Sequence, residues 1–440
     1  MKALALFAFC LMPAFGQANR RPFALEELSL PPGFQISVHA RVTGGPRHLT
    51  IGPNGVLYAT GYNNGTVVAI PEPDRVVTIL RGLNGPHTLA FREGSLYVGL
   101  RDAVVRYSDA VTEDFVIHSQ PRRLFTLPTG GHATRSIGFA PDGGLFVSIG
   151  SSCNFCLEAD SRRAAILRYD ADGTNQTIYA RGLRNSVGFA WHPVSGELWA
   201  GDNGGDNLGD NEPPEEVNIV REGGDYGWPD CVGSRRPANW GAQARPGRCP
   251  DTVVPQVEYQ AHSAPLGLTF YTGDNFPLSY KNDAFVAFHG SWNRSVPTGY
   301  KLVRIHAASG RATGTEDFLT GFLSADNRTT SGRPVHAVTA PDGALFVSDD
   351  STGNIYRIEY AGPRIDENGV TFNEDTGLYT ITGRRLMTDT PPQVSVNDIS
   401  AEIVNASDTR IDFLMPDVHG GITIKVTTPV ATDTAQISVE

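Results

Sequence analysis

The sequence has few of the features that are typical of long helices. Methionine occurs only 4 times in 440 residues, and no segment sustains the apolar period of an amphipathic helix. Glycine is frequent instead, at 48 residues, together with 30 prolines. With 40% hydrophobic residues, this composition favours short strands joined by many tight turns. The length suits two or three domains, or one large repeat architecture with an added module.

Positive charge is also scarce. The chain has 36 Lys and Arg against 47 Asp and Glu, so its formal net charge is −11. An acidic surface does not attract nucleic acid or an anionic membrane, which excludes both as expected partners. Basic residues that matter for function must therefore act locally.

One long apolar run lies at the N-terminus, in MKALALFAFCLMPAFGQA. A single lysine, the apolar stretch and small residues at Gly16 and Ala18 predict a secretory signal peptide over residues 1–18. The run is too short to span a bilayer, and we expect no transmembrane segment. The sequence therefore predicts a secreted protein, periplasmic or extracellular. The alternative is that this run forms a first buried segment of the fold.

Cysteine is rare, and Cys10 would be removed with the signal peptide. The remaining cysteines are Cys153, Cys156, Cys231 and Cys249. An even number in an exported chain predicts two disulfides, and proximity favours Cys153 with Cys156 and Cys231 with Cys249, although other pairings are formally possible. A zinc site is the alternative, but the histidines lack finger-like spacing.

A turn of the Pro-Asp-Gly type followed by a strand-like run recurs along the chain. Copies stand at 52–62, 92–102, 140–150, 192–203 and 340–350, and a looser unit without this turn spans 265–306. Most copies have a strand before the turn and another after it, which predicts antiparallel meanders of three or four strands. About six such units predict an all-β fold, a six-bladed β-propeller over 25–362. Several sandwiches in series are the alternative.

The pattern changes after Tyr360. Residues 361–369, AGPRIDENG, predict a turn-rich linker, and short strands over 366–440 predict a small immunoglobulin-like β-sandwich. This segment has no cysteine and only one histidine, His419. We therefore expect the chemistry to lie in the propeller.

Polar residues recur just ahead of the predicted inner blade strands. They are Arg47, His48, His87, His132, Arg135, Arg184, Asn185, Arg333 and His336. Equivalent strand starts face the same end of a propeller, where ligands bind over the central channel. Converging arginines suit an anionic ligand with several carboxylates, and His132 suits a general base near neutral pH. Solvated loop residues are the alternative at each position.

The loop Asp202–Glu216, DNGGDNLGDNEPPEE, is crowded with oxygen ligands. Gly204 and Gly205 free backbone carbonyls, and with Asp206 they predict a calcium site. The loop is not an EF-hand, because the helical flanks and the closing Glu of that motif are missing. A solvated acidic loop is the alternative.

Four segments carry a resemblance to a known family. They are HATRSIGFAPDGGLFVSIGSSCNFC, GLRNSVGFAWHPVSGELWAGDNGGDN, GGDYGWPDC and SGRPVHAVTAPDGALFVSDDSTGNIYRI. Over roughly residues 30–360 the chain resembles the pyrroloquinoline quinone (PQQ) dependent glucose/sorbosone dehydrogenases, which are soluble six-bladed propellers. The resemblance implies an exported, PQQ- and calcium-dependent enzyme that oxidises an aldose, sorbosone or a related sugar and passes electrons to a cytochrome or quinone acceptor.

The resemblance also implies roles for single residues. His132 would take the hydroxyl proton as hydride passes to C5 of PQQ, and Arg184 would stabilise charge on the quinone oxygens. The cofactor-binding residues would be Arg47, Arg135, Asn185, Arg294 and Arg333, with Asn293 an alternative to Arg294. Calcium would be held at Gly204, Gly205 and Asp206.

The chain departs from the soluble glucose dehydrogenase pattern at several positions. Gly131 replaces an Asp, Leu83 a Gln, Val335 an Arg and Gly205 a Pro. These departures favour the sorbosone or pyranose dehydrogenase branch. Two other functions stay open: a calcium-dependent propeller lactonase or esterase, and a non-enzymatic propeller that binds carbohydrate or protein.

Overall fold

The computed structural model describes residues 18–110, 112–307 and 309–437, so the expected signal peptide lies, except for Ala18, outside the described residues. The described chain is built of strands, with short 3-10 helices at η1 (Leu25–Glu27), η2 (Pro246–Asp251) and η3 (Leu278–Tyr280). This confirms the predicted all-β class. Of the helices described, none has the length and apolar character that crossing a bilayer would require.

Six antiparallel sheets follow one another along the chain. The first contains β3 (Pro46–Ile51), β4 (Leu57–Gly61), β5 (Thr66–Glu72) and β6 (Arg75–Leu80). The second contains β7 (Thr88–Arg92), β8 (Ser95–Gly99), β9 (Ala103–Tyr107) and β10 (Arg122–Thr126). The third contains β11 (Arg135–Phe139), β12 (Leu145–Ile149), β13 (Ala165–Tyr169) and β14 (Thr177–Arg181), and β18 (Gly224–Asp225) adds to it in parallel.

The remaining three sheets also contain four strands each, and the fourth strand of the sixth sheet, β2, comes from the N-terminal part of the chain. The fourth contains β15 (Ser186–Trp191), β16 (Leu198–Asp202), β17 (Glu215–Val220) and β21 (Val257–Tyr259). The fifth contains β22 (Pro265–Phe270), β23 (Ala284–Phe288), β24 (Lys301–His306) and β25 (Gly314–Leu319). The sixth contains β27 (Pro334–Thr339), β28 (Leu345–Asp349), β29 (Asn354–Tyr360) and β2 (Phe34–Arg41).

The first strands of these sheets form a closed ring. Strand β3 contacts β7, and the contacts continue through β11, β15, β22 and β27 back to β3. The second strand of each sheet, β4, β8, β12, β16, β23 or β28, is buried along its whole length. Stacking of neighbouring sheets explains this burial, because it covers both faces of the second strand.

The N-terminal strand β2 closes the circle of six sheets by completing the sixth sheet, at the edge opposite β27. It pairs antiparallel with β29, and Phe34 lies opposite Tyr360. The Phe34 ring packs against Phe276, Phe318 and Tyr360 at centroid distances of 4.7, 5.0 and 4.9 Å. Residues from both ends of the ring segment therefore hold the sixth sheet together.

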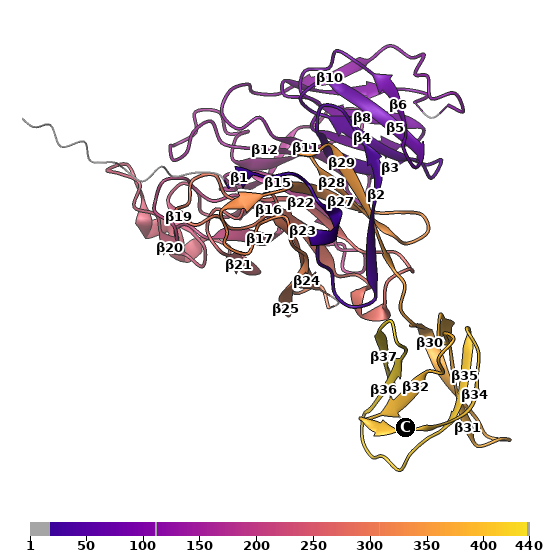
Figure 1. Cartoon of the computed structure of the whole chain (residues 1–440). Coiled ribbons are helices and arrows are strands. Elements are labelled where there is room, and N and C mark those ends of the chain that lie inside the picture. The colour runs from indigo at the N-terminus through magenta and orange to yellow at the C-terminus, as the bar shows by residue number, and fades with distance from the viewer. Residues whose placement is uncertain (1–17, 111, 308, 438–440) are drawn as a thin grey trace, which may run out of the picture.

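Two further sheets follow residue 363 (Figure 1, yellow). One contains β30 (Arg364–Asn373), β31 (Leu378–Arg384), β35 (Arg410–Leu414) and β34 (Glu402–Ala406), and the other β33 (Ile399–Ser400), β32 (Gln393–Val396), β36 (Ile422–Thr427) and β37 (Thr432–Ile437). Ile381 and Phe413 of the first sheet share a core with Val394 and Ile424 of the second. The immunoglobulin-like type of this pair stays a prediction.

The predicted linker at 361–369 is wrong from Arg364 onward, because β30 begins there. Ile365 is fully buried in the core between the two C-terminal sheets, and its backbone N–H donates to Asp433 Oδ2 at 2.7 Å. Arg364 and Ile365 pair with β31, and the turn-forming residues 366–369 lie in the irregularity of this pairing before Val370, where Asn368 has a φ of 57°.

Both predicted disulfides are present, Cys153–Cys156 and Cys231–Cys249. The second closes an excursion after β17 that contains β19 (Cys231–Val232) and β20 (Arg236–Pro237). Because these four cysteines are all paired in the disulfides, they are not zinc ligands.

Two short strands, β1 (Asn19–Arg20) and β26 (Thr329–Thr330), pair in parallel.

Replacing Phe34 tests how far the ring depends on its closing strand. Phe34→Ala removes a partly buried aromatic ring that packs against the core of the fifth and sixth sheets, and we expect it to cost up to about 3 kcal/mol of stability. We expect a lower midpoint of thermal unfolding. The matched control is Phe372→Ala, because Phe372 is 52% exposed. Equal midpoints for the two variants would contradict the closing role of β2.

Candidate functional site

The strand starts singled out in the sequence lie at one end of the ring. In each sheet the first strand runs antiparallel to the second, so Arg135 lies opposite Ile149, Ser186 opposite Asp202, and Pro334 opposite Asp349. The loop that enters a first strand therefore lies beside the loop that leaves the second strand. These paired loops carry the candidate residues.

His132 lies in the loop before β11, and its orientation is fixed by Ser151. Its Nδ1 lies 3.0 Å from Ser151 O and 3.0 Å from Ser151 Oγ. Since a carbonyl oxygen only accepts, Nδ1 carries the proton and Nε2 presents a lone pair. Burial, together with the nearby Arg184 guanidinium, lowers the pKa of His132 to about 4. The imidazole is therefore neutral at pH 7.

The Asn185 side chain lies beside His132. A Cβ atom placed on Gly150 would lie 2.4 Å from Asn185 Oδ1 and 2.6 Å from His132 Cβ, so glycine is needed between them. Asn185 Oδ1 is buried and has no hydrogen-bond partner in the described part of the chain. Asn185 Oδ1 and the Cβ atom of His132 therefore both lie close to Gly150.

Arg184 has a different setting, because its guanidinium is already engaged. Its side chain is 4% exposed. It donates to Asn154 O at 3.1 Å, to Asn154 Oδ1 at 2.9 Å, to Gly204 O at 2.6 Å and to Asp206 Oδ2 at 2.8 Å. The charge of Arg184 acts on His132, while its donors hold neighbouring loops together.

These contacts bear directly on the expected calcium ligands. Gly204 O accepts from Arg184, and Asp206 accepts from Arg184 at one carboxylate oxygen and from Asn293 at the other, 2.8 Å away. A Cβ atom on Gly205 would lie 2.0 Å from the Phe155 ring, so that position is closely packed. A dication bound at Gly204 O and Asp206 would have to displace the Arg184 cation. As they lie, these residues do not fit calcium.

Asn154 is a residue that sequence reasoning missed. Its backbone oxygen accepts from Arg184 and from Trp228 Nε1, Oδ1 also accepts from Asp206 N at 2.7 Å, and Nδ2 donates to Asp206 O at 2.8 Å. It lies between the disulfide partners Cys153 and Cys156. The CNFC sequence predicted the disulfide, but nothing in it signals partners 30 and 52 residues away.

A second charged cluster lies around Asp350, which follows β28. Its carboxylate accepts from Arg47 at 2.9 Å and contacts His289 Nε2 at 2.8 Å. Burial alone would raise the pKa of Asp350, but His289 and Arg47 lower it to about 2, so the group is ionised. Sequence reasoning missed Asp350 and His289, whose partners come from other sheets.

Arg333 adjoins this cluster. It donates from Nε to His289 O at 2.9 Å and from Nη2 to Gly290 O at 2.7 Å. Arg333 Nη1 and Arg47 Nη2 make no hydrogen bond with the described residues. Two guanidinium groups thus keep a free edge each, which suits carboxylate groups on a ligand.

Arg135 and Arg294 are placed differently from the other arginines. Arg135 is 1% exposed and donates to the His132 carbonyl at 2.9 Å, with further bonds to the carbonyls of Thr134 and Pro128. Arg294 donates to Val296 O at 2.9 Å and to Asp210 O. Asn293, the alternative to Arg294, is the residue that reaches Asp206. Loop 289–293 thus links the Asp206 and Asp350 clusters.

Comparison with known proteins gives one family for most of the chain. The TrAA12-like family model matches residues 28–361. An uncharacterized protein of Borreliella burgdorferi is 33% identical over 348 residues, which is 76% of this chain and 91% of that protein. A pyrroloquinoline quinone-dependent sugar dehydrogenase of Hypocrea jecorina is 26% identical, over 74% of this chain and 82% of that protein.

A solved structure agrees with the observed fold. The calcium structure of a Trichoderma reesei carbohydrate-active enzyme of family AA12 is 23% identical, with a TM-score of 0.65 over 76% of this chain and 97% of that chain. At this identity the similarity supports the fold and not the chemistry.

Calcium titration tests whether Arg184 excludes the ion. We expect calcium to raise the melting temperature of the protein no more than magnesium does, because Gly204 O and Asp206 are occupied. Arg184→Met frees both groups, so calcium should then stabilise the variant more than magnesium does. Selective stabilisation of the unaltered protein by micromolar calcium would contradict this prediction, whether or not the variant folds.

Proposed function

The chain belongs to the TrAA12-like family, and from that premise we propose that it is an exported oxidoreductase that uses PQQ to oxidise an aldose, sorbosone or a related sugar. The six sheets serve as the blades of a propeller, and the chain from Arg364 onward forms a separate sandwich module. One observation carries the proposal: His132 is a neutral imidazole whose Nε2 makes no hydrogen bond with the described residues, and Asn185, whose buried Oδ1 is also unpaired among them, lies with His132 against Gly150.

The free donors fit PQQ, which carries several carboxylates. Arg47 and Arg333 would hold these carboxylates through their unused guanidinium edges. Asp350 fixes the Arg47 guanidinium at 2.9 Å, and the carbonyls of His289 and Gly290 fix that of Arg333. The Asn185 amide would bond a polar group of the cofactor. Bound there, PQQ supplies the oxidant that accepts two electrons from the sugar.

His132 would act as the general base. The sugar hydroxyl donates to Nε2, which takes its proton, while Nδ1–H stays bonded to Ser151 O at 3.0 Å and keeps the ring in place. The low pKa keeps the ring unprotonated at pH 7, at the cost of a weaker driving force for proton transfer. Arg135 holds the His132 backbone carbonyl, so it positions this loop.

Arg184 would stabilise negative charge through its field, since its hydrogen-bond donors are engaged by Asn154, Gly204 and Asp206. The calcium ion that the resemblance implies plays no part in this proposed mechanism, because Gly204 O and Asp206 already accept hydrogen bonds from Arg184 and Asn293. The particular sugar and the electron acceptor, a cytochrome or a quinone, stay predictions.

PQQ binding tests the role of Arg333. We expect PQQ to bind the full chain at micromolar concentration, and Arg333→Met to weaken binding by about tenfold or more, since a charge-assisted hydrogen bond contributes roughly 1.5–3 kcal/mol. The measurement is a titration followed by the absorbance of PQQ. Arg328→Met is the control, because the Arg328 side chain is 83% exposed. Absent binding, or equal weakening by both variants, would refute the proposal.

The pH profile tests the role of His132. A base whose folded-state pKa is lowered keeps its unprotonated form down to that pKa, so kcat/KM should fall only as the pH drops toward about 4. His132→Gln should lose 10²–10⁴-fold in kcat, as measured by dye reduction with a sugar panel. Circular dichroism at pH 4.5 checks that the fold persists. An acidic limb near the ordinary histidine pKa would count against His132.

A further inference from the structure

Two side chains that sequence reasoning missed, Tyr62 and Arg101, lie at the end of the ring that carries the candidate site. Tyr62 follows β4 and Arg101 follows β8 after one residue, so both stand in loops that leave second strands. Such loops lie beside the loops that enter the first strands. Arg101 is exposed, and Tyr62 is half-buried.

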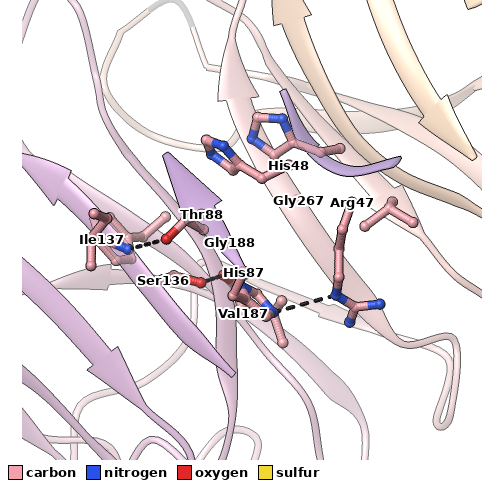
Figure 2. Close-up of a pocket in the computed structure, with 12 residues that line it drawn as sticks. Arg47, His48, His87, Thr88, Ser136, Ile137, Val187, Gly188 and Gly267 are labelled. Carbon is pink, nitrogen blue, oxygen red and sulfur yellow. Dashed lines mark hydrogen bonds between the residues drawn. The ribbon is translucent and has the colours of Figure 1, made fainter. Parts of the chain in front are cut away.

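The Tyr62 phenol joins Arg101 to Arg47. Arg101 donates to the Tyr62 hydroxyl from Nε at 3.0 Å and from Nη2 at 2.7 Å. The guanidinium carbon of Arg101 lies 4.9 Å from the centroid of the Tyr62 ring, and that of Arg47 lies 5.3 Å from it. Arg47 in turn donates from Nε to His87 Nε2 at 3.4 Å (Figure 2). Two guanidinium groups therefore lie around one aromatic ring.

On its other side Arg101 adjoins the loop that carries His132. Asp102, the next residue, accepts at its backbone oxygen from Leu127 N at 2.8 Å. Leu127 begins the segment between β10 and β11, and His132 lies in this segment. Because the second sheet contacts both the first and the third, Arg101 stands between Arg47 and the His132 loop.

Backbone contacts hold the Arg101 side chain in place. The Arg101 backbone N–H donates to Asn84 O at 3.1 Å. Gly85 has a φ of 54°, and a Cβ atom placed on it would lie 2.7 Å from Arg101 Nε, so this glycine lets the loop approach the side chain closely. A ligand that binds an already fixed side chain loses less conformational entropy.

The hydrogen-bond donors of Tyr62 and Arg101 are only partly used. The Tyr62 hydroxyl oxygen accepts both bonds from Arg101, and its own hydrogen reaches no acceptor among the described residues. Arg101 Nη1 also makes no hydrogen bond with them, and Arg101 forms no salt bridge in the described part of the chain. Arg47, by contrast, is paired with Asp350. The charge of Arg101 is therefore left without a counter-charge.

A carboxylate fits these donors better than other groups do. A cation would be repelled by Arg101 and Arg47. A hydroxyl of a neutral sugar could accept one hydrogen bond, but it has no charge to pair with Arg101. A carboxylate can accept from the Tyr62 hydroxyl and from the free edge of the guanidinium, and its charge is then paired.

We propose that Arg101 and Tyr62 bind a carboxylate of the substrate, which makes that substrate a sugar acid such as a uronic acid. This inference rests on the proposed function. PQQ is assigned to Arg47, whose side chain is 19% exposed, and to the half-buried Arg333, whereas the exposed Arg101 faces a molecule that enters and leaves. A uronic acid keeps its anomeric hydroxyl, so His132 would act on it as on a neutral aldose.

Paired substrates test this proposal by dye reduction with PQQ bound. The kcat/KM for glucuronate should exceed that for glucose by about tenfold or more, because only glucuronate forms the charge-assisted hydrogen bonds. Arg101→Met should lower this ratio by about tenfold or more, and Tyr62→Phe should also lower it. The control is Arg328→Met, at a side chain 83% exposed, which should keep the ratio. A preference for glucose, or an unchanged ratio in Arg101→Met, would overturn the proposal.

Binding measurements separate the substrate from PQQ as the source of the carboxylate. Arg101→Met should bind PQQ as tightly as the unaltered chain in an absorbance titration, and weaker binding would assign Arg101 to the cofactor and overturn the sugar-acid proposal. If the unaltered chain binds no PQQ, the proposed function fails, and calorimetric titration of the full chain with glucuronate and glucose decides. Selective glucuronate binding that Arg101→Met loses supports the site, and its absence refutes it.

Discussion

The guanidinium of Arg184 holds the candidate site together. It ties the loop before β15 to Asn154 in the loop after β12 and to Gly204 and Asp206 in the loop after β16. The backbone N–H of Arg184 in turn donates to Asp202 at the end of β16. The same positive charge, together with burial, sets the low pKa of His132. One buried cation therefore fixes the geometry of these loops and helps to keep the His132 imidazole neutral.

Polar residues lie inside the ring because their side chains form hydrogen bonds with the free backbone groups of the first strands. The free edge of each first strand exposes backbone groups that need hydrogen-bond partners inside the ring. Serine and threonine hydroxyls of neighbouring sheets bond the carbonyls, and His48 and His336 accept the N–H groups of Leu89 and Leu49. An acidic protein thus carries basic and polar side chains at the centre of its ring.

Much of the fold could be predicted from the sequence, because it depends on residue patterns that are local in the chain. Turns after an inner strand, alternation within strands and the spacing of the repeats depend on neighbours along the chain. The pairing of Cys231 with Cys249 followed from proximity in the same way. The closing strand β2 and strand β30 escaped prediction, since their partners β29 and β31 and the core around Ile365 exist only in the folded chain.

The sequence by itself determined which side chains enter the candidate site from the strand starts, among them Arg47, His132, Asn185 and Arg333, because a repeated unit places equivalent positions at one end. Only the tertiary structure decided what these side chains do. In the folded chain Arg184 donates to Gly204 and Asp206. Asn154, His289 and Asp350 also contact the candidate residues, and His87 Nδ1 has no hydrogen-bond partner among the described residues. These outcomes depend on contacts between different sheets, and hydrogen-bond partners far apart in the sequence leave no local pattern.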